Sequence, residues 1–172
     1  IQNADISEDA YYEIIKGKTA ALFEACAAIG AESVGASQED VLAAKKFGQN
    51  IGIIFQIRDD IFDYYNSDEI GKPTGNDMLD GKLTLPAIYA LNSTNNEEMK
   101  AIARKVKARA ISSDEIAKLV EFTKQNGGID YAEKRMWYFH SECMNFLDCK
   151  VYDEQIRKSL MAYIDYVIKR KL

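Results

Sequence analysis

The most informative stretch of this chain runs Phe47-Gly48-Gln49-Asn50-Ile51-Gly52-Ile53-Ile54-Phe55-Gln56-Ile57-Arg58-Asp59-Asp60-Ile61-Phe62-Asp63. Apolar residues recur through it at helical spacing, which predicts one long helix. On a period of 3.6 residues, Asp59 and Asp63 lie one turn apart, with Asp60 beside them and Gln56 one turn below. Clustered carboxylates repel one another unless a cation lies between them, and hard oxygens suit Mg²⁺. The stretch therefore predicts a metal site, although a bare D-D-x-x-D pattern is more often a solvated acidic face.

Two glycines and a glutamine precede the acids on the same helix face. Gly48, Gln49 and Gly52 project with Gln56 and the aspartates within an arc of about 120°. Each glycine costs a helix interior about 1 kcal/mol relative to alanine, so the backbone must need a close approach there. We expect this polar stripe to face a cavity; the alternative is a close helix crossing at the glycines.

Composition excludes several classes of protein. The chain has 172 residues, of which 47% are hydrophobic and two are prolines, so we expect one domain with a sizeable core. A formal net charge of −5 argues against a nucleic-acid partner. Cys26, Cys143 and Cys149 lack paired spacing, which predicts neither disulfides nor zinc and favours a reducing compartment. No apolar run reaches the roughly 18 residues of a membrane span, so we expect a cytoplasmic protein.

Periodicity predicts helices through most of the chain and no strand. The predicted helical segments cover about 7–33, 37–65, 86–91, 97–110, 113–126, 129–149 and 153–170, with a loop over 66–79. The fold class is therefore all-α, an antiparallel helix bundle with short connections. The apolar residues of 136–147 are interpreted as core, and His140 as a structural residue rather than a base.

Three lysines beside glycine suit an anion. Lys18 lies in Gly17-Lys18-Thr19, Lys72 lies in the glycine-rich loop that follows the acids, and Lys82 repeats the Gly-Lys pair at the end of that loop. Loops hung on a rigid helix commonly close on ligands. Carboxylates and lysines together predict a phosphate or diphosphate ligand, bridged by metal on one side and clamped by ammonium groups on the other. No P-loop pattern is present, which argues against a nucleotide hydrolase.

The order of these motifs resembles that of the trans-polyprenyl diphosphate synthases. The run from Phe47 to Asp63 resembles the second aspartate-rich motif of that family, and Lys18-Thr19 resembles its lysine-threonine pair. Downstream, Gly71-Lys72-x2-Gly75-Asn76-Asp77 and Gly81-Lys82-x-Thr84-x-Pro86 resemble its loop and the following helix. The matched blocks cover about positions 11 to 91.

The resemblance implies an isoprenoid-synthase fold and a prenyltransferase reaction. Isopentenyl diphosphate would condense head-to-tail with an allylic diphosphate, whose ionisation three Mg²⁺ ions would assist. It implies that Asp59 is the principal metal ligand, with Asp63 and Asp60 acting through metal-bound water. Lys18 and Lys72 would clamp the allylic diphosphate, Lys82 would add a further substrate contact, and Thr19 and Gln56 would lie along the path of the carbocation.

One departure from the family is large. The family carries a first aspartate-rich motif on an earlier helix, and this chain has no other D-D-x-x-D. We therefore expect residues 1–172 to be a single partial domain, the C-terminal half of a synthase. It is expected to be inactive without the N-terminal half, to expose apolar surface that promotes association, and to form a homodimer when complete. Two alternatives stay open, a non-catalytic small subunit of a heteromeric synthase and a terpene cyclase relative.

Overall fold

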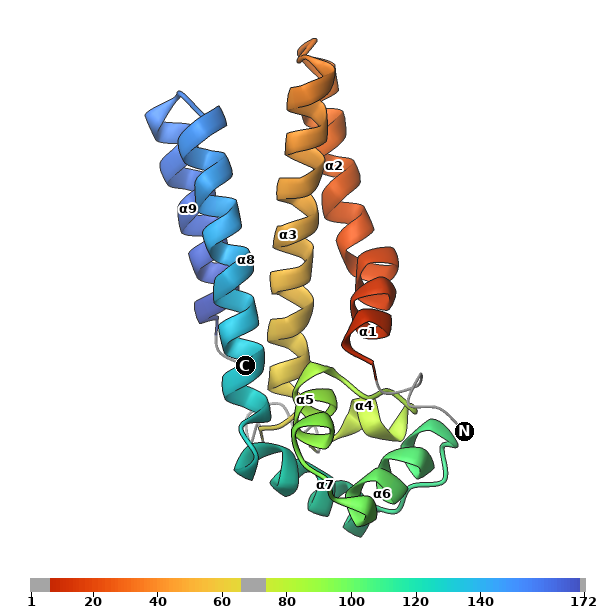
Figure 1. Ribbon diagram of the computed structural model, residues 1–172. Coiled ribbons are helices and arrows are strands. Elements are labelled where there is room, and N and C mark those ends of the chain that lie inside the picture. The colour runs from red at the N-terminus through yellow and green to blue at the C-terminus, as the bar shows by residue number, and fades with distance from the viewer. Residues whose placement is uncertain (1–6, 66–73, 171–172) are drawn as a thin grey trace. The chain divides into compact units, whose positions relative to one another are not determined.

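The computed structural model describes residues 7–65 and 74–170, and all regular structure within them is helical (Figure 1). This confirms the predicted fold class. The helices are α1 (Glu8–Ile15), the π-helical turn η2 (Lys16–Ala20), α2 (Ala21–Ser33), α3 (Gln38–Phe62), α4 (Asn76–Leu79), α5 (Leu85–Ser93), α6 (Glu97–Lys107), α7 (Ser113–Gln125), α8 (Gly128–Lys150) and α9 (Glu154–Lys169).

The described residues group into two compact units. Unit 1 contains residues 7–11, 59–65 and 74–133, and unit 2 contains residues 12–58 and 134–170. The boundary between them falls within α1, α3 and α8, so each of these helices contributes to both units. The prediction of a single partial domain over 1–172 stays a prediction.

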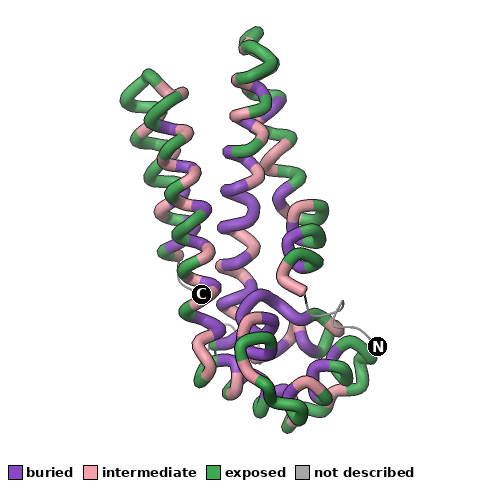
Figure 2. The backbone as a smooth tube through the Cα atoms, in the orientation of Figure 1, coloured by how far each residue is buried: buried purple, intermediate pink, exposed green. Residues whose placement is uncertain are grey.

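Unit 2 is a bundle of long helices. Within it α2 runs antiparallel to α3, and α8 runs antiparallel to α9 (Figure 1). The α3 helix carries a row of buried positions (Figure 2), of which Ile53, Ile54 and Ile57 have no exposed surface. Phe47 of α3 stacks on Phe146 of α8 with ring centroids 4.5 Å apart. Burial on several sides of α3 explains why its sequence is apolar over so wide an arc.

The glycines of α3 lie at a close helix crossing, which is the alternative that the sequence left open for them. A Cβ atom at Gly48 would lie 2.4 Å from the backbone oxygen of Phe23, and one at Gly52 would lie 2.4 Å from the Cα of Ala20. On the same face, Gln49 donates to the carboxylate of Glu24 at 3.1 Å. This part of the stripe therefore packs against η2 and α2, and the glycines are needed because the two backbones nearly touch.

Unit 1 contains the shorter helices. Its core is built on Leu85 and Leu91 of α5 and Leu119 of α7, each with at most 1% of its surface exposed. Tyr89 stacks on Tyr131, with ring centroids 4.1 Å apart. Pro86 is tolerated at the first turn of α5 because that turn has no intrahelical acceptor for its missing N–H.

Side-chain caps fix several helix starts where the sequence predicted them. Ser112 and Glu115 form a reciprocal capping box at the start of α7. The Asp153 carboxylate accepts from the N–H of Ile156 at 2.9 Å and starts α9. Each cap satisfies a backbone donor that the helix itself leaves open.

Two predictions made from the sequence are wrong. The segment 76–79, assigned to the loop, forms the single-turn helix α4. Trp137 and Tyr138, assigned to the core, have 46% and 49% of their surface exposed. Met136, Phe139 and Leu147 are buried as predicted. The apolar run 136–139 fills a full turn of α8, so part of it must point away from the neighbouring helices.

His140, interpreted from the sequence as a structural residue, pairs with a residue of the neighbouring helix. Its Nε2 lies 3.1 Å from a carboxylate oxygen of Asp165 on α9.

Across the described residues, no helix is both long enough and apolar enough to cross a membrane.

Candidate functional site

The predicted residues Lys18 and Thr19 lie on a break in regular helix. The five residues Lys16–Ala20 form a π-helical turn between α1 and α2, and the N–H of Ala21 bonds to both Lys16 O and Thr19 O. Such turns insert one extra residue and re-aim the side chains they carry, and they occur often at functional sites. Gly17 eases the distortion, and the Lys18 side chain is exposed.

Thr19 and Gln56, both predicted to lie along the path of a carbocation, are in direct contact. The Thr19 hydroxyl donates to Oε1 of Gln56 at 2.6 Å, which joins residues 37 positions apart. This bond fixes the carboxamide orientation of Gln56. It also commits the hydroxyl proton, so the lone pairs of Thr19 Oγ1 remain available to stabilise positive charge.

The three predicted acids differ in their surroundings. Asp59 is partly exposed. Asp60 is 3% exposed, and its Oδ2 accepts a hydrogen bond from the phenol of Tyr11 at 2.6 Å. Asp63 accepts from the backbone N–H groups of residues 76 and 77 at 2.9 and 3.1 Å.

The burial of Asp63 sets its acidity. Burial raises the pKa of this carboxyl, and the backbone N–H of Asp77 opposes that rise. The negative charge of the Asp77 side chain raises it further. The carboxylate is thus held by hydrogen bonds that favour its charged form in surroundings that disfavour charge.

Tyr11 contacts one of the predicted acids, and sequence reasoning missed it. It is 6% exposed and precedes the lysine-threonine pair by two helical turns. Its apolar neighbours in α1 make it indistinguishable from an ordinary core tyrosine in the sequence. Only the contact with Asp60 reveals its connection with the acids.

Lys82 is exposed and lies between two acids. Its ammonium group is 2.9 Å from the Asp80 carboxylate and 3.2 Å from that of Asp77. The hydrogen bond to Asp80 is the main reason that the pKa of Lys82 is raised. Lys72, the remaining predicted diphosphate ligand, lies outside the described residues.

The described residues do not by themselves form a complete metal site. Within 7–65 and 74–170, no group of three acidic, histidine or cysteine side chains is placed to hold an ion. The buried carboxylate of Asp60 faces a phenol, and that of Asp63 faces backbone N–H groups. The assignment of Asp59, Asp60 and Asp63 as metal ligands stays a prediction, and any metal bound here would need further ligands.

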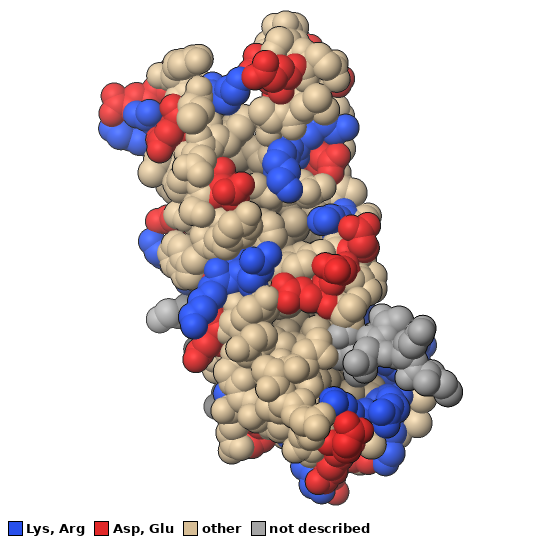
Figure 3. Space-filling model, viewed as in Figure 1, with Lys and Arg blue, Asp and Glu red and all other residues tan. Residues whose placement is uncertain are grey.

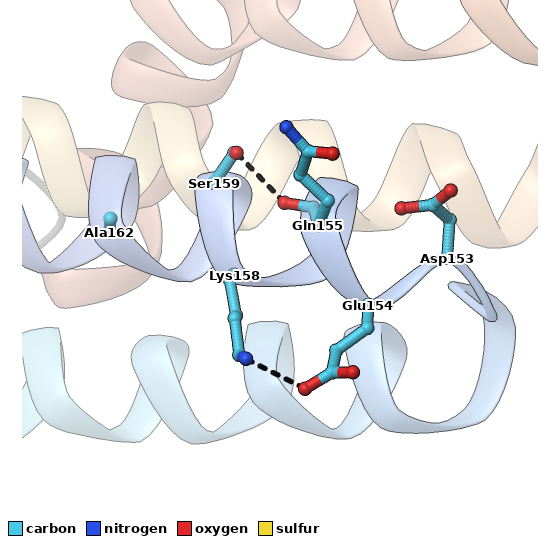
Figure 4. A pocket seen from close by; sticks show the side chains of 6 residues that line it. All are labelled: Asp153, Glu154, Gln155, Lys158, Ser159 and Ala162. Carbon is cyan, nitrogen blue, oxygen red and sulfur yellow. Dashed lines mark hydrogen bonds and ion pairs between the residues drawn. The ribbon is translucent and has the colours of Figure 1, made fainter.

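A surface hollow on α9 contains none of the predicted residues. It is lined by Asp153, Glu154, Gln155, Lys158, Ser159 and Ala162 (Figure 4). Lys158 pairs with Glu154 at 2.7 Å, and the Ser159 hydroxyl donates to the backbone oxygen of Gln155 at 2.8 Å. The lysine and serine of this hollow thus bond within the helix, and we assign no site to it.

On the face shown in Figure 3, the acidic and basic side chains of the described residues are interspersed, with no extended region of one sign.

The family model named polyprenyl synthetase matches residues 1–123 of the chain. The chain belongs to the polyprenyl synthetase family. The match includes the π-helical turn, the whole of α3 and the Gly-Lys pair before α5, which are the elements that the motif order singled out. Membership confirms the resemblance inferred from the sequence.

Relatives within the polyprenyl synthetase family agree. The chain is 33% identical to a geranylfarnesyl diphosphate synthase from Aeropyrum pernix over 168 residues, which cover 96% of this chain and 52% of that protein. The crystal structure of a geranylgeranyl pyrophosphate synthase from Bacteroides thetaiotaomicron is 49% identical with a TM-score of 0.92, covering 98% of this chain and 55% of that one.

A third member of the polyprenyl synthetase family carries ligands. A polyprenyl synthase from Caulobacter crescentus, solved in complex with calcium and isoprenyl diphosphate, is 28% identical with a TM-score of 0.83. The match covers 96% of this chain and 51% of that one. The chain thus spans about half the length of the relatives it matches.

Proposed function

We propose that this chain is part of a trans-prenyltransferase that condenses isopentenyl diphosphate head-to-tail with an allylic diphosphate. The contact between Thr19 and Gln56 carries the proposal, because it joins two residues from separate motifs that the resemblance assigns to one chemical task. Membership of the polyprenyl synthetase family supports it. The relatives named above are diphosphate synthases, which favours chain elongation over the cyclase alternative.

The roles proposed for the residues of unit 2 follow from their surroundings. The exposed Lys18 ammonium would bind diphosphate oxygens of the allylic substrate. Thr19 would present its oxygen lone pairs to the cation left by departure of diphosphate, and its bond to Gln56 would hold both groups in place. A fixed dipole of this kind needs no reorganisation when charge develops.

The acidic residues would supply oxygen ligands to Mg²⁺, with Asp59 as the principal ligand. A bound Mg²⁺ would stabilise negative charge on the departing diphosphate. The Caulobacter relative, solved with calcium and isoprenyl diphosphate, supports a divalent cation in this role. The remaining ligands would come from outside this chain, so the number of ions is left as the expectation of three drawn from the resemblance.

The proposed reaction requires the half of the synthase that lies outside the region of its relatives matched by this chain. Alone, the 172 residues are expected to give no elongation of labelled isopentenyl diphosphate in the presence of Mg²⁺ and an allylic diphosphate. Large exposed apolar side chains in unit 2, such as Leu22 at 68% and Ile29 at 65%, support a missing covering segment. A homodimer of the complete protein stays a prediction.

A chimera tests the proposal. The portion of the Bacteroides thetaiotaomicron synthase that this chain does not match is joined to this chain, and elongation is measured with radiolabelled isopentenyl diphosphate. We expect activity that falls about 100-fold or more in Lys18→Ala and Asp59→Asn variants. Lys158→Ala on exposed α9 is the control and should leave the rate unchanged. A folded chimera without activity, or robust elongation by the 172-residue chain alone, would overturn the proposal.

A further inference from the structure

The carboxylate of Asp63 faces the first turn of α4. Its Oδ1 accepts from the N–H of Asn76 at 2.9 Å, and its Oδ2 accepts from the N–H of Asp77 at 3.1 Å. Its backbone oxygen accepts from the N–H of Gly75 at 2.9 Å. Three backbone N–H groups therefore tie this residue to three successive residues that lie 12 to 14 positions further along the chain.

This arrangement supplies a cap that α4 lacks. The N-cap residue of α4 is Gly75, which has no side chain to accept from the first N–H groups of the helix. These groups are left without intrahelical partners in any helix, and an aspartate is among the best acceptors for them. Asp63 meets the need from outside the helix.

The start of α4 is held in place independently by α7. Gly75 is buried and has a φ of +80°, and a Cβ there would lie 2.3 Å from the Cγ2 of Ile116. Only glycine fits this position without strain. The position of the N–H groups that face Asp63 is therefore set by packing, and the carboxylate completes it.

The α4 helix in turn holds Lys82. The backbone N–H of Lys82 donates to the oxygen of Asp77 at 2.8 Å, and its ammonium group lies 3.2 Å from the carboxylate of Asp77. Asp77 thus links the Asp63 carboxylate to Lys82 within unit 1.

We infer that Asp63 is a positioning residue, which caps α4 and through Asp77 holds Lys82, the residue expected to contact substrate, and that both oxygens of its carboxylate are committed to this cap. The inference about Lys82 rests on the proposed function, whereas the inference about the cap does not. The inference gives Asp63, the last acid of the D-D-x-x-D pattern, a role in the fold of the segment that follows the motif.

Amide hydrogen exchange, resolved by NMR on the 172-residue chain, tests the inference without any assay of activity. In Asp63→Asn one carboxylate oxygen becomes an NH₂ group, which cannot accept from a backbone N–H. We expect exchange at Asn76 and Asp77 to accelerate about fivefold or more, since losing a cap costs about 1 kcal/mol. Exchange at Lys82 should accelerate with it, and exchange at the core residue Leu119 should stay the same. Asp59→Asn is the matched control and should leave residues 76 and 77 within twofold of the wild type.

The chimera, which supplies the part of the metal site that this chain lacks, allows a second measurement without any substitution, so it applies even if Asp63→Asn fails to fold. Exchange at Asn76 and Asp77 is compared in EDTA and in 20 mM Mg²⁺. A capping carboxylate stays on its two amides, so no acceleration is expected. Acceleration of fivefold or more in Mg²⁺, or unchanged exchange at both residues in a folded Asp63→Asn variant, would overturn the inference. Because neither measurement depends on elongation, absence of elongation by the chimera would leave the cap standing.

Discussion

The phenol of Tyr11 donates a hydrogen bond of 2.6 Å to the buried carboxylate of Asp60, which lies 49 positions away in the sequence. Tyr11 is 6% exposed and Asp60 is 3% exposed, so water reaches neither group freely. A buried carboxylate without donors is costly, and a hydroxyl donor offsets that cost. The contact also ties the start of α1 to the acidic end of α3. Both residues belong to unit 1.

Tyr11→Phe should destabilise the protein. The substitution removes only the hydroxyl, and hydrogen bonds to charged groups contribute roughly 1.5–3 kcal/mol, so we expect the free energy of unfolding to fall by about 2 kcal/mol. Urea denaturation followed by circular dichroism measures it. Tyr152→Phe is the control, because Tyr152 is 90% exposed and should give no change. Equal stability of the two variants would show that the contact contributes nothing.

Alanine at two helical glycines should act in opposite directions. Gly48→Ala places a Cβ 2.4 Å from the backbone oxygen of Phe23, which cannot rotate away, so we expect a loss of about 2 kcal/mol. Gly30 lies inside α2 with nothing within 4 Å of an added Cβ, so Gly30→Ala should gain about 0.5–1 kcal/mol. Thermal unfolding of both variants tests the helix crossing. A stabilising Gly48→Ala would contradict it.

The three thiols should separate into two classes. Cys26 and Cys149 are exposed, whereas Cys143 is fully buried. Burial, aided by the charge of Glu142, raises the pKa of Cys143 to about 12, so its thiolate is scarce at pH 8. Titration with Ellman's reagent at pH 8 should label two thiols quickly and the third only on unfolding. Rapid labelling of three thiols in the native chain would contradict the packing of α8.

Asp165 should contribute stability that is lost in acid. The hydrogen bond from Lys169, and then the one from His140, lowers the pKa of this carboxyl below its ordinary value of 3.8. The ionised carboxylate therefore stabilises the fold above pH 3.8, and that stabilisation disappears as the pH falls through the lower folded value. A ¹³C NMR titration of the carboxyl measures the shift. Lys169→Ala should raise the pKa of Asp165 more than His140→Asn does. The opposite order would show that His140, and not Lys169, is the main cause of the lowered pKa.

The apolar surface of unit 2 should drive self-association of the chain. Leu22 and Ile29 lie seven positions apart on α2, so they share one face, and both are more than 60% exposed. Replacing both with serine should lower the sedimentation coefficient at high concentration toward that of a monomer. The unfolding midpoint should change little, since neither side chain is in the core. If the double substitution leaves self-association unchanged, the surface that drives association does not include Leu22 and Ile29.

The sequence predicted helix positions well because their signals are local. Apolar spacing along the chain and caps such as Ser112 with Glu115 act within one or two turns, so the printed residues contain them. Short elements are harder. The single turn of α4 is stabilised by Asp63, 13 positions before Asn76, and no local pattern indicates such a partner.

The sequence by itself determined the all-α class, the order of the motifs and hence the family, because each depends on residue type and spacing along one chain. The tertiary structure decided what each polar residue faces. The helical period places Gly48, Gln56 and Asp60 on one side of α3, but it cannot say that Gly48 touches Phe23, that Gln56 bonds to Thr19 or that Asp60 bonds to Tyr11. Those contacts form between segments far apart in the sequence, and only packing of the whole chain brings them together.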